Sequence, residues 1–99
     1  MIFGWFDAKP AQALGSDLAR AFMSRVPVNA KVSDRKFEVK AKAALLEIER
    51  RIADFKTSQR LNFYRKAKLG NAFKWTLKDA GYDPAYVDKL TDLVMLQPQ

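Results

Sequence analysis

The stretch from Ser33 to about Leu69 constrains the fold more strongly than any other part of the sequence. Its apolar residues recur mostly at intervals of three and four positions, which places them on one face of an α-helix. Charged side chains lie between them, and Glu47 precedes Arg51 by four residues, the favourable order for a helical ion pair. Other elements must cover such a face. The face consists of Phe37, Ala41, Ala44, Leu45, Ile48, Ile52 and Phe55.

The apolar face does not continue regularly beyond Phe55. The next positions at helical spacing, three of which are polar, are Gln59, Asn62, Phe63 and Lys66. We therefore expect either one long central helix over about residues 34–69, or two helices in tandem with a break near Thr57 and Ser58. In the second case, Ser58 is the expected cap of the new segment.

A shorter amphipathic helix is predicted near the N-terminus. Asp7 is suited to cap it and Pro10 to lie in its first turn. Gly15 lies inside this helix at a cost of about 1 kcal/mol relative to alanine. The dipeptide Val26-Pro27 is expected to end it. Its predicted buried face, with one residue every four positions, is Leu14, Leu18, Phe22 and Val26.

Two further helices are predicted toward the C-terminus. Gly70-Asn71 has the pattern of a helix stop followed by a cap, so a short helix is expected over residues 72–80, with Gly81 closing it. Asp83-Pro84 is typical of a cap followed by proline at the first helical position. The predicted inner face of the third helix is Phe73, Leu77 and Ala80, and that of the last helix is Tyr86, Leu90, Leu93 and Val94.

These patterns define the expected fold class. No alternating apolar pattern indicates a strand. The sequence therefore predicts an all-α fold, a single helical domain over residues 1–99, built as a small bundle of about four helices organised on one long central helix over about residues 34–69. Because a lone long helix cannot bury its own apolar face, the other helices or a second copy of the chain must cover it.

Composition argues against an enzyme and against a metal or cofactor site. The chain has no cysteine and no histidine, so it lacks the commonest general base, metal ligands and haem ligands. Asp88 and Asp92 lie one helical turn apart, but without histidine partners they are better interpreted as solvated carboxylates. No apolar run approaches the roughly 18 residues needed to span a bilayer, and the N-terminus does not resemble a signal peptide. We expect a cytoplasmic, non-enzymatic protein.

The positive charge is concentrated in one window. The formal net charge is +7, and residues 57–78 hold six basic side chains and no acidic one. Aromatic rings are interleaved with these cations, a mixture that suits phosphates and unpaired bases. The sequence thus predicts an anionic partner, with nucleic acid favoured over acidic protein surfaces and single strands over duplex. The candidate site residues are Arg60, Tyr64, Arg65, Lys66, Lys68, Lys74, Trp75 and Lys78.

Several alternatives remain open at this stage. In one, Phe63, Phe73 and Trp75 pack in the core while the lysines only solvate the surface. In another, the chain is a protein interaction module or a homodimer that pairs through the long helix and the N-terminal aromatic residues. Those residues, Phe3, Trp5 and Phe6, are candidates to cover the core, to bind a partner or to contact a membrane surface.

Residues 76–90 have some features of a helix-turn-helix that reads duplex DNA. This interpretation is disfavoured, because the second helix would present three carboxylates and only one lysine to the phosphates. An ordinary helical hairpin is the better expectation. The carboxylates are Asp83, Asp88 and Asp92, and the lysine is Lys89.

Overall fold

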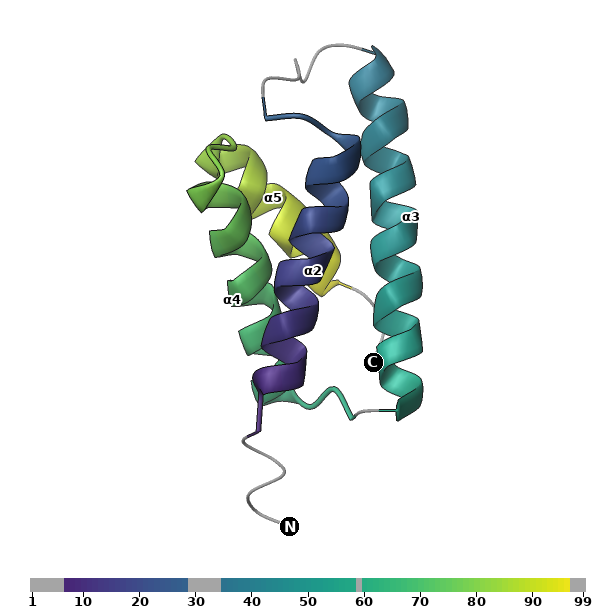
Figure 1. Cartoon of the computed structure of the whole chain (residues 1–99), viewed down its shortest axis with the longest axis vertical. Coiled ribbons are helices and arrows are strands. Elements are labelled where there is room, and N and C mark those ends of the chain that lie inside the picture. The colour runs from purple at the N-terminus through teal and green to yellow at the C-terminus, as the bar shows by residue number, and fades with distance from the viewer. Residues whose placement is uncertain (1–6, 29–34, 59, 97–99) are drawn as a thin grey trace.

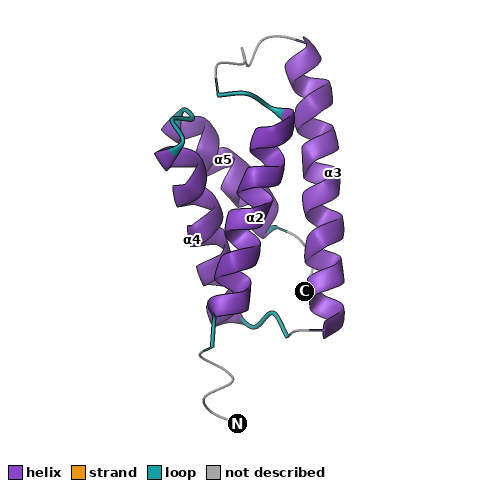
Figure 2. Cartoon of the chain, in the orientation of Figure 1, coloured by secondary structure: helices purple, strands orange, loops and turns teal. Residues whose placement is uncertain are grey.

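The protein is built from helices, as the sequence predicts. The computed structural model describes residues 7–28, 35–58 and 60–96. These residues form four helices and no strand (Figures 1 and 2). The helices are α2 (Lys9–Arg25), α3 (Arg35–Ser58), α4 (Phe63–Asp79) and α5 (Pro84–Met95). The all-α bundle of about four helices is confirmed. The N-terminal aromatic residues and the expected cap at Ser33 or Asp34 lie outside the described residues.

Helix α2, and not the longest helix, lies at the centre of the bundle. It packs against α4 on one side and α3 on the other (Figure 1). Helix α5 packs on α4 and touches α3, whereas the backbones of α3 and α4 do not pack side by side within the described segments. Helix α3 ends at Ser58 and α4 begins at Phe63. The prediction of one continuous central helix over about residues 34–69 is therefore wrong. The alternative with two helices in tandem describes this region correctly.

Side-chain hydrogen bonds define the break between α3 and α4. Thr57 Oγ1 donates to the Asp54 carbonyl at 2.6 Å, and Ser58 Oγ donates to the Phe55 carbonyl at 3.3 Å. These local bonds compete with the backbone bonds that would extend the helix. The new helix is capped by Asn62, whose Oδ1 accepts from the Arg65 amide at 2.8 Å. The predicted cap at Ser58 is thus wrong, although the predicted position of the break is right.

The core forms where α2 meets the apolar faces of the other helices. Phe22 and Leu18 of α2 are fully buried with Ile48 of α3 and with Leu69 and Phe73 of α4. Full burial of such side chains stabilises the fold by about 1.5–3 kcal/mol each. The apolar face predicted for α3 is confirmed: Phe37 is buried, three other members are at most 3% exposed, and the remaining members pack against the core. Those three are Ala44, Ile48 and Ile52.

Two predictions about α4 need correction. Gly70 and Asn71 lie inside α4 and do not separate two helices. The Met95 side chain packs over Gly70, and a Cβ atom there would lie 2.6 Å from Sδ of Met95 unless that flexible side chain moved. The helix instead ends before Gly81, whose φ of +99° is in the left-handed region that glycine adopts without strain. Ala80, predicted to be buried, is exposed.

The start of α5 agrees with the sequence pattern. Asp83 Oδ2 accepts from the Tyr86 amide at 2.9 Å, and Pro84 follows as the first helical residue. Tyr86 packs between two other rings, with centroid distances of 5.4 Å to Phe37 and 6.3 Å to Phe22. Leu90 and Val94 are buried as predicted. Leu93 is half exposed, and Val87 takes the buried position in its place, so that part of the predicted face is wrong.

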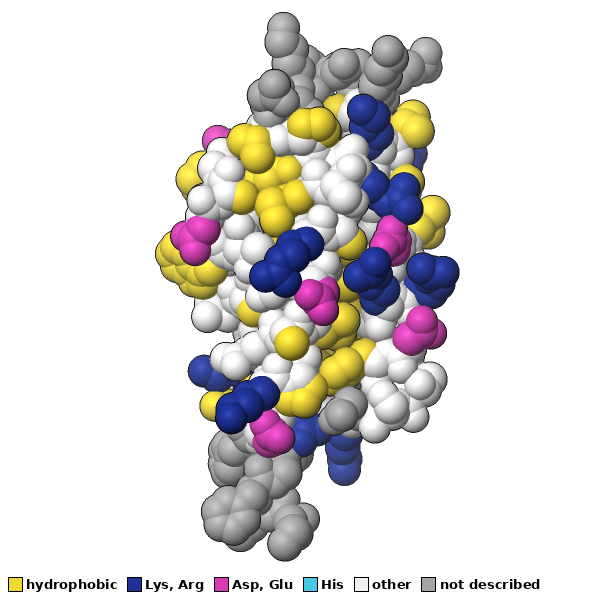
Figure 3. All heavy atoms as spheres, in the orientation of Figure 1, with side chains coloured by type: hydrophobic (Ala, Val, Ile, Leu, Met, Phe, Trp, Pro, Cys, Tyr) yellow, Lys and Arg dark blue, Asp and Glu magenta, His cyan; other side chains and the backbone are white. Residues whose placement is uncertain are grey.

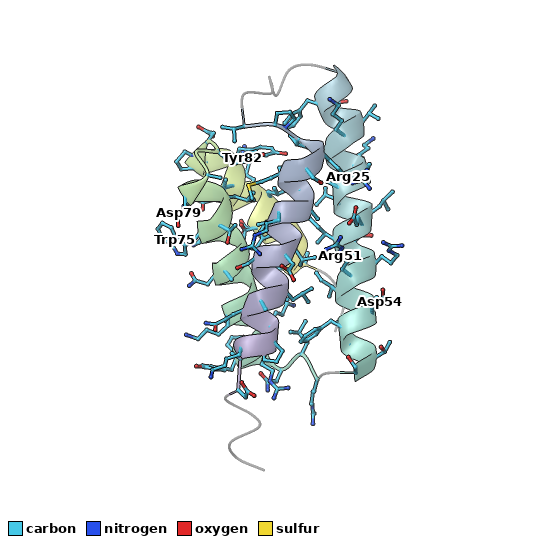
Figure 4. All side chains as sticks on the ribbon, in the orientation of Figure 1. Arg25, Arg51, Asp54, Trp75, Asp79 and Tyr82 are labelled. Atoms are coloured by element: carbon cyan, nitrogen blue, oxygen red, sulfur yellow. The ribbon has the colours of Figure 1, made fainter. Side chains whose placement is uncertain are left out.

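A cluster of charged side chains ties α2 to α3. Nε and Nη2 of Arg25 donate to Glu47 Oε1 at 3.0 and 2.8 Å, and Arg51 donates to Glu47 Oε2 at 2.6 Å. Figure 4 shows both arginines between the two helices. The hydrogen bond from Arg25, more than any other interaction, holds the pKa of Glu47 below its ordinary value. The cluster is structural, and it confirms the predicted pair of Glu47 and Arg51.

Candidate nucleic-acid interface

The side of α4 that faces away from α2 carries half of the candidate site. Residues of α4 at intervals of four, three, four and three positions share this side, opposite the buried Leu69, Phe73 and Leu77. We call these residues the outer stripe of α4. They are Tyr64, Lys68, Asn71, Trp75 and Lys78. Because α2 holds the opposite face through its largest contact in the bundle, the outer stripe rests on a rigid element.

Trp75 is the central aromatic residue of the outer stripe. Its side chain is 51% exposed, and Figure 4 shows it projecting from α4 away from α2. Lys78 Nζ lies 5.3 Å from the centroid of the Trp75 ring and Lys74 Nζ lies 6.0 Å from it. Two ammonium groups therefore flank one exposed indole, an arrangement in which cation–π attraction contributes about 0.5–1 kcal/mol at an exposed site.

A second pair of the same kind lies near the start of α4. Lys68 Nζ is 5.4 Å from the centroid of the Tyr64 ring, and both side chains are partly exposed. The spacing from Tyr64 to Trp75 is eleven residues, or about 16 Å at the 1.5 Å rise of an α-helix. The outer stripe thus presents two rings, each with its own lysine, along one line.

Two carboxylates reduce the positive charge at the C-terminal end of the outer stripe. Lys78 Nζ forms an ion pair with Asp88 Oδ1 at 3.0 Å, and the Lys78 side chain is only 20% exposed. Asp79 is exposed and projects from α4 on the same side as Trp75 (Figure 4). Residues 57–78 contain no acidic side chain, but in the folded protein the end of α4 and α5 bring Asp79 and Asp88 close to them. The cations near Tyr64 and Lys68 lack such acidic neighbours in sequence.

The remaining candidate residues lie at the start of α4 and have different surroundings. Arg60 is exposed in the segment between α3 and α4. Arg65 has a structural role, because its Nε donates to the Asp7 carbonyl at 3.0 Å and its Nη1 donates to the Arg60 carbonyl at 2.8 Å. Lys66 is partly buried. The eight candidate residues therefore form two groups: the outer-stripe candidates with Lys74, and Arg60, Arg65 and Lys66 around the start of α4, where Arg65 contacts the chain before α2.

The sequence left open which aromatic rings of α4 are buried and which are exposed. The spacing of the apolar residues of α4 distinguishes the two kinds. Leu69, Phe73 and Leu77 recur every four residues, so Phe73 belongs to the buried face and Trp75, two positions later, to the opposite one. Phe63 is 85% exposed, so of the two alternatives for this ring the exposed one is right. Its exposure follows from the cap at Asn62, which makes Phe63 the first residue of α4.

The surface over α3 is also charged, but it carries charges of both signs. In Figure 3, lysine and arginine side chains over α3 alternate with aspartate and glutamate side chains. Alternating signs cancel at distances beyond a Debye length of about 8 Å at physiological salt. Helix α3 is therefore a poor surface for a polyanion, and the outer stripe of α4 is the better candidate.

Comparisons with known proteins give no further assignment. No protein-family model, curated protein or solved structure matches this chain.

Among residues 7–28, 35–58 and 60–96, no helix combines the length and the apolar character needed to cross a membrane. Within the described part of the chain, acidic side chains do not gather in groups of three that could hold a metal ion.

Proposed function

We propose that this chain is a cytoplasmic, non-enzymatic helical protein that binds single-stranded nucleic acid along the outer stripe of α4. The observation that carries the proposal is the half-exposed Trp75 ring held between Lys74 and Lys78 on the side of α4 away from the core. An exposed ring stacks on an unpaired base of any sequence, and flanking ammonium groups neutralise the adjoining phosphates.

The geometry favours a single strand over a duplex. The two rings lie about 16 Å apart on one helix face, and only unpaired bases expose faces on which rings of this kind stack. The alternative in which α5 reads a duplex is unfavourable, because Asp83 caps α5 and Asp88 pairs with Lys78. Both carboxylates therefore lie on the helix that would have to face the phosphates, which they would repel.

The proposal predicts weak, salt-sensitive binding. Each phosphate neutralised on a single strand contributes about 0.7 to the slope of log K against log salt concentration. Lys68 and Lys74 carry the least compensated charge beside the two rings, so Lys68→Ala combined with Lys74→Ala should reduce that slope by about 1.4. The measurement is fluorescence anisotropy of a labelled oligothymidylate over a salt series.

A matched control removes the same charge elsewhere. Lys40→Ala with Arg50→Ala also removes two exposed cations, but from α3, which lies on the other side of α2 (Figure 1). This control should change the slope far less than the α4 variant does. Equal changes for both variants, or no binding by the unaltered protein at low salt, would overturn the proposal.

A further inference from the structure

The charge along α4 changes from one end of the helix to the other. Residues 60–69 hold four basic side chains and no acidic one. Residues 74–92, which include the end of α4 and the first part of α5, hold three basic and four acidic side chains. The exposed Trp75 ring, on which the proposed binding depends, lies near the boundary between these two regions. The acidic residues are Asp79, Asp83, Asp88 and Asp92.

Helix α5 places its acidic side chains beside only the second half of α4. Asp88 pairs with Lys78, and the Met95 side chain packs over Gly70, so α5 runs antiparallel to α4 between these two contacts (Figure 1). Asp92 lies one turn beyond Asp88 and therefore within this stretch. Helix α5 ends at Met95. The part of α4 that precedes Gly70 thus lies beyond the end of α5.

Two of these carboxylates lie close to the Trp75 ring. Lys78 Nζ is 5.3 Å from the ring centroid and 3.0 Å from Asp88 Oδ1, so the Asp88 carboxylate lies within about one Debye length of the ring, or about 8 Å at physiological salt. Asp79 follows Trp75 by four residues, is exposed and projects on the same side (Figure 4). The last carbonyl groups of α4 add the partial negative charge of a helix C-terminus. A phosphate beyond Trp75 in this direction would be repelled.

The opposite direction along the outer stripe attracts a phosphate backbone. Lys68 precedes Trp75 by seven residues, or about 10 Å along the helix, and a stacked strand advances about 3.4 Å per nucleotide. Lys68 is therefore level with about the third phosphate from a base on Trp75, and Arg60 is exposed farther on. Asp7 lies near this end, where its carbonyl accepts from Arg65 Nε, but the four basic side chains of residues 60–69 outnumber it.

We propose that the outer stripe takes the end of a single strand, with the terminal base on Trp75 and the backbone leaving along α4 toward Lys68 and Arg60. This inference rests on the proposed function and adds to it which part of the strand binds and in which direction its backbone runs. The cations attract the phosphates on one side of Trp75, whereas Asp79 and Asp88 repel phosphates on the other side. The interior of a strand, which has phosphates on both sides of every base, therefore binds less tightly than an end.

A comparison of linear and circular oligothymidylate of the same length tests the preference for an end. The linear strand carries hydroxyl groups at both termini, and both forms compete with a labelled strand for the protein. A circle has no terminal base, so a base on Trp75 always brings a phosphate toward Asp79 and Asp88. The unaltered protein should bind the linear form roughly fivefold more tightly at low salt. Asp79→Asn combined with Asp88→Asn should remove most of this difference by raising the affinity for the circle.

A matched control removes two carboxylates elsewhere. Glu38→Gln with Asp54→Asn neutralises two exposed acids of α3 and should leave the ratio of the two affinities unchanged. Equal binding of both forms by the unaltered protein, or a difference that the α4–α5 variant retains, would overturn this inference while the proposed function stands. Binding of neither form at low salt would overturn both.

A terminal phosphate provides a second test of the arrangement. Added to the terminus that lies on Trp75, it enters the region of Asp79 and Asp88 and should weaken binding of the linear strand. Added to the other terminus, it should not weaken binding, because that end lies toward the cations. Weaker binding with a phosphate at both termini, or at neither, would contradict the proposed direction of the backbone.

Discussion

Helices α2 and α4 approach each other so closely at Gly15 that Gly15→Ala should destabilise the protein. In an exposed helix interior, replacing glycine by alanine stabilises a protein by about 1 kcal/mol. At Gly15 the added Cβ atom would lie 2.3 Å from the Leu69 carbonyl oxygen and 3.0 Å from Cβ of Ala72. Ordinary contact begins at 3.4 Å, so α2 and α4 must separate by about 1.1 Å.

The size of the effect follows from what must move. The Leu69 oxygen belongs to the backbone of α4 and cannot rotate away, so the separation loosens the largest helix pair of the bundle. Overpacking of this kind costs about 1–3 kcal/mol, and occasionally more. Taking a cost near the upper end and subtracting the gain in helix propensity leaves a net loss of about 2 kcal/mol. Denaturation by urea, monitored by circular dichroism at 222 nm, measures this loss.

Gly70→Ala provides the matched control. Its added Cβ atom would also approach another atom closely, at 2.6 Å, but that atom is Sδ of the flexible Met95 side chain. Since Met95 is only partly buried and is able to move, Gly70→Ala should keep most of the gain in helix propensity, and the free energy of unfolding should stay the same or rise by up to about 1 kcal/mol. If Gly15→Ala were as stable as the unaltered protein, or if both variants lost the same stability, the described packing of α2 on α4 would be wrong.

Three further predictions concern charge and capping. Glu47→Gln should lower the denaturation midpoint at neutral pH. The Arg25 hydrogen bond lowers the pKa of Glu47 in the folded protein, so the ionised Glu47 side chain stabilises the fold fully at any pH above the ordinary glutamate pKa. This stabilisation is lost as the pH falls through the lowered pKa of the folded protein. The difference in stability between the unaltered protein and Glu47→Gln should therefore vanish in acid. Asp83→Ala should cost about 1 kcal/mol of unfolding free energy by removing the α5 cap, whereas Asp83→Asn should cost little. Asp88→Asn should tighten oligonucleotide binding at low salt, because it frees Lys78 from its ion pair; unchanged affinity would count against a role for Lys78.

Local patterns in the sequence predicted much of the fold. The spacing of apolar residues placed Ile48 and Ile52 in the core, and Asp83-Pro84 marked the start of α5. These signals are readable because each depends on residues within a turn or two of one another. The break after Ser58 was also visible, as the loss of apolar residues beyond Phe55.

The errors arise where distant parts of the chain meet. Gly70 resembles a helix stop, but α4 continues through it and the side chain of Met95, twenty-five residues later, packs over it. In the structure, Gly15 allows α4 to approach α2 closely, which contributes to the central position of α2. From the sequence alone, the same glycine appears only as a residue that weakens a helix. Likewise, the charge window predicted the basic residues of the candidate site, whereas the neutralising contact of Asp88 comes from a different helix.

The central claim is that Trp75 stacks on an unpaired base between two lysines. The chain has two tryptophans, so Trp5→Phe leaves Trp75 as the sole source of indole fluorescence. Titrating this variant with oligothymidylate at low salt should quench its emission in parallel with the anisotropy of the labelled strand, and added salt should reverse both signals. Emission that does not change while the oligonucleotide binds, or an absence of binding at low salt, would contradict the account.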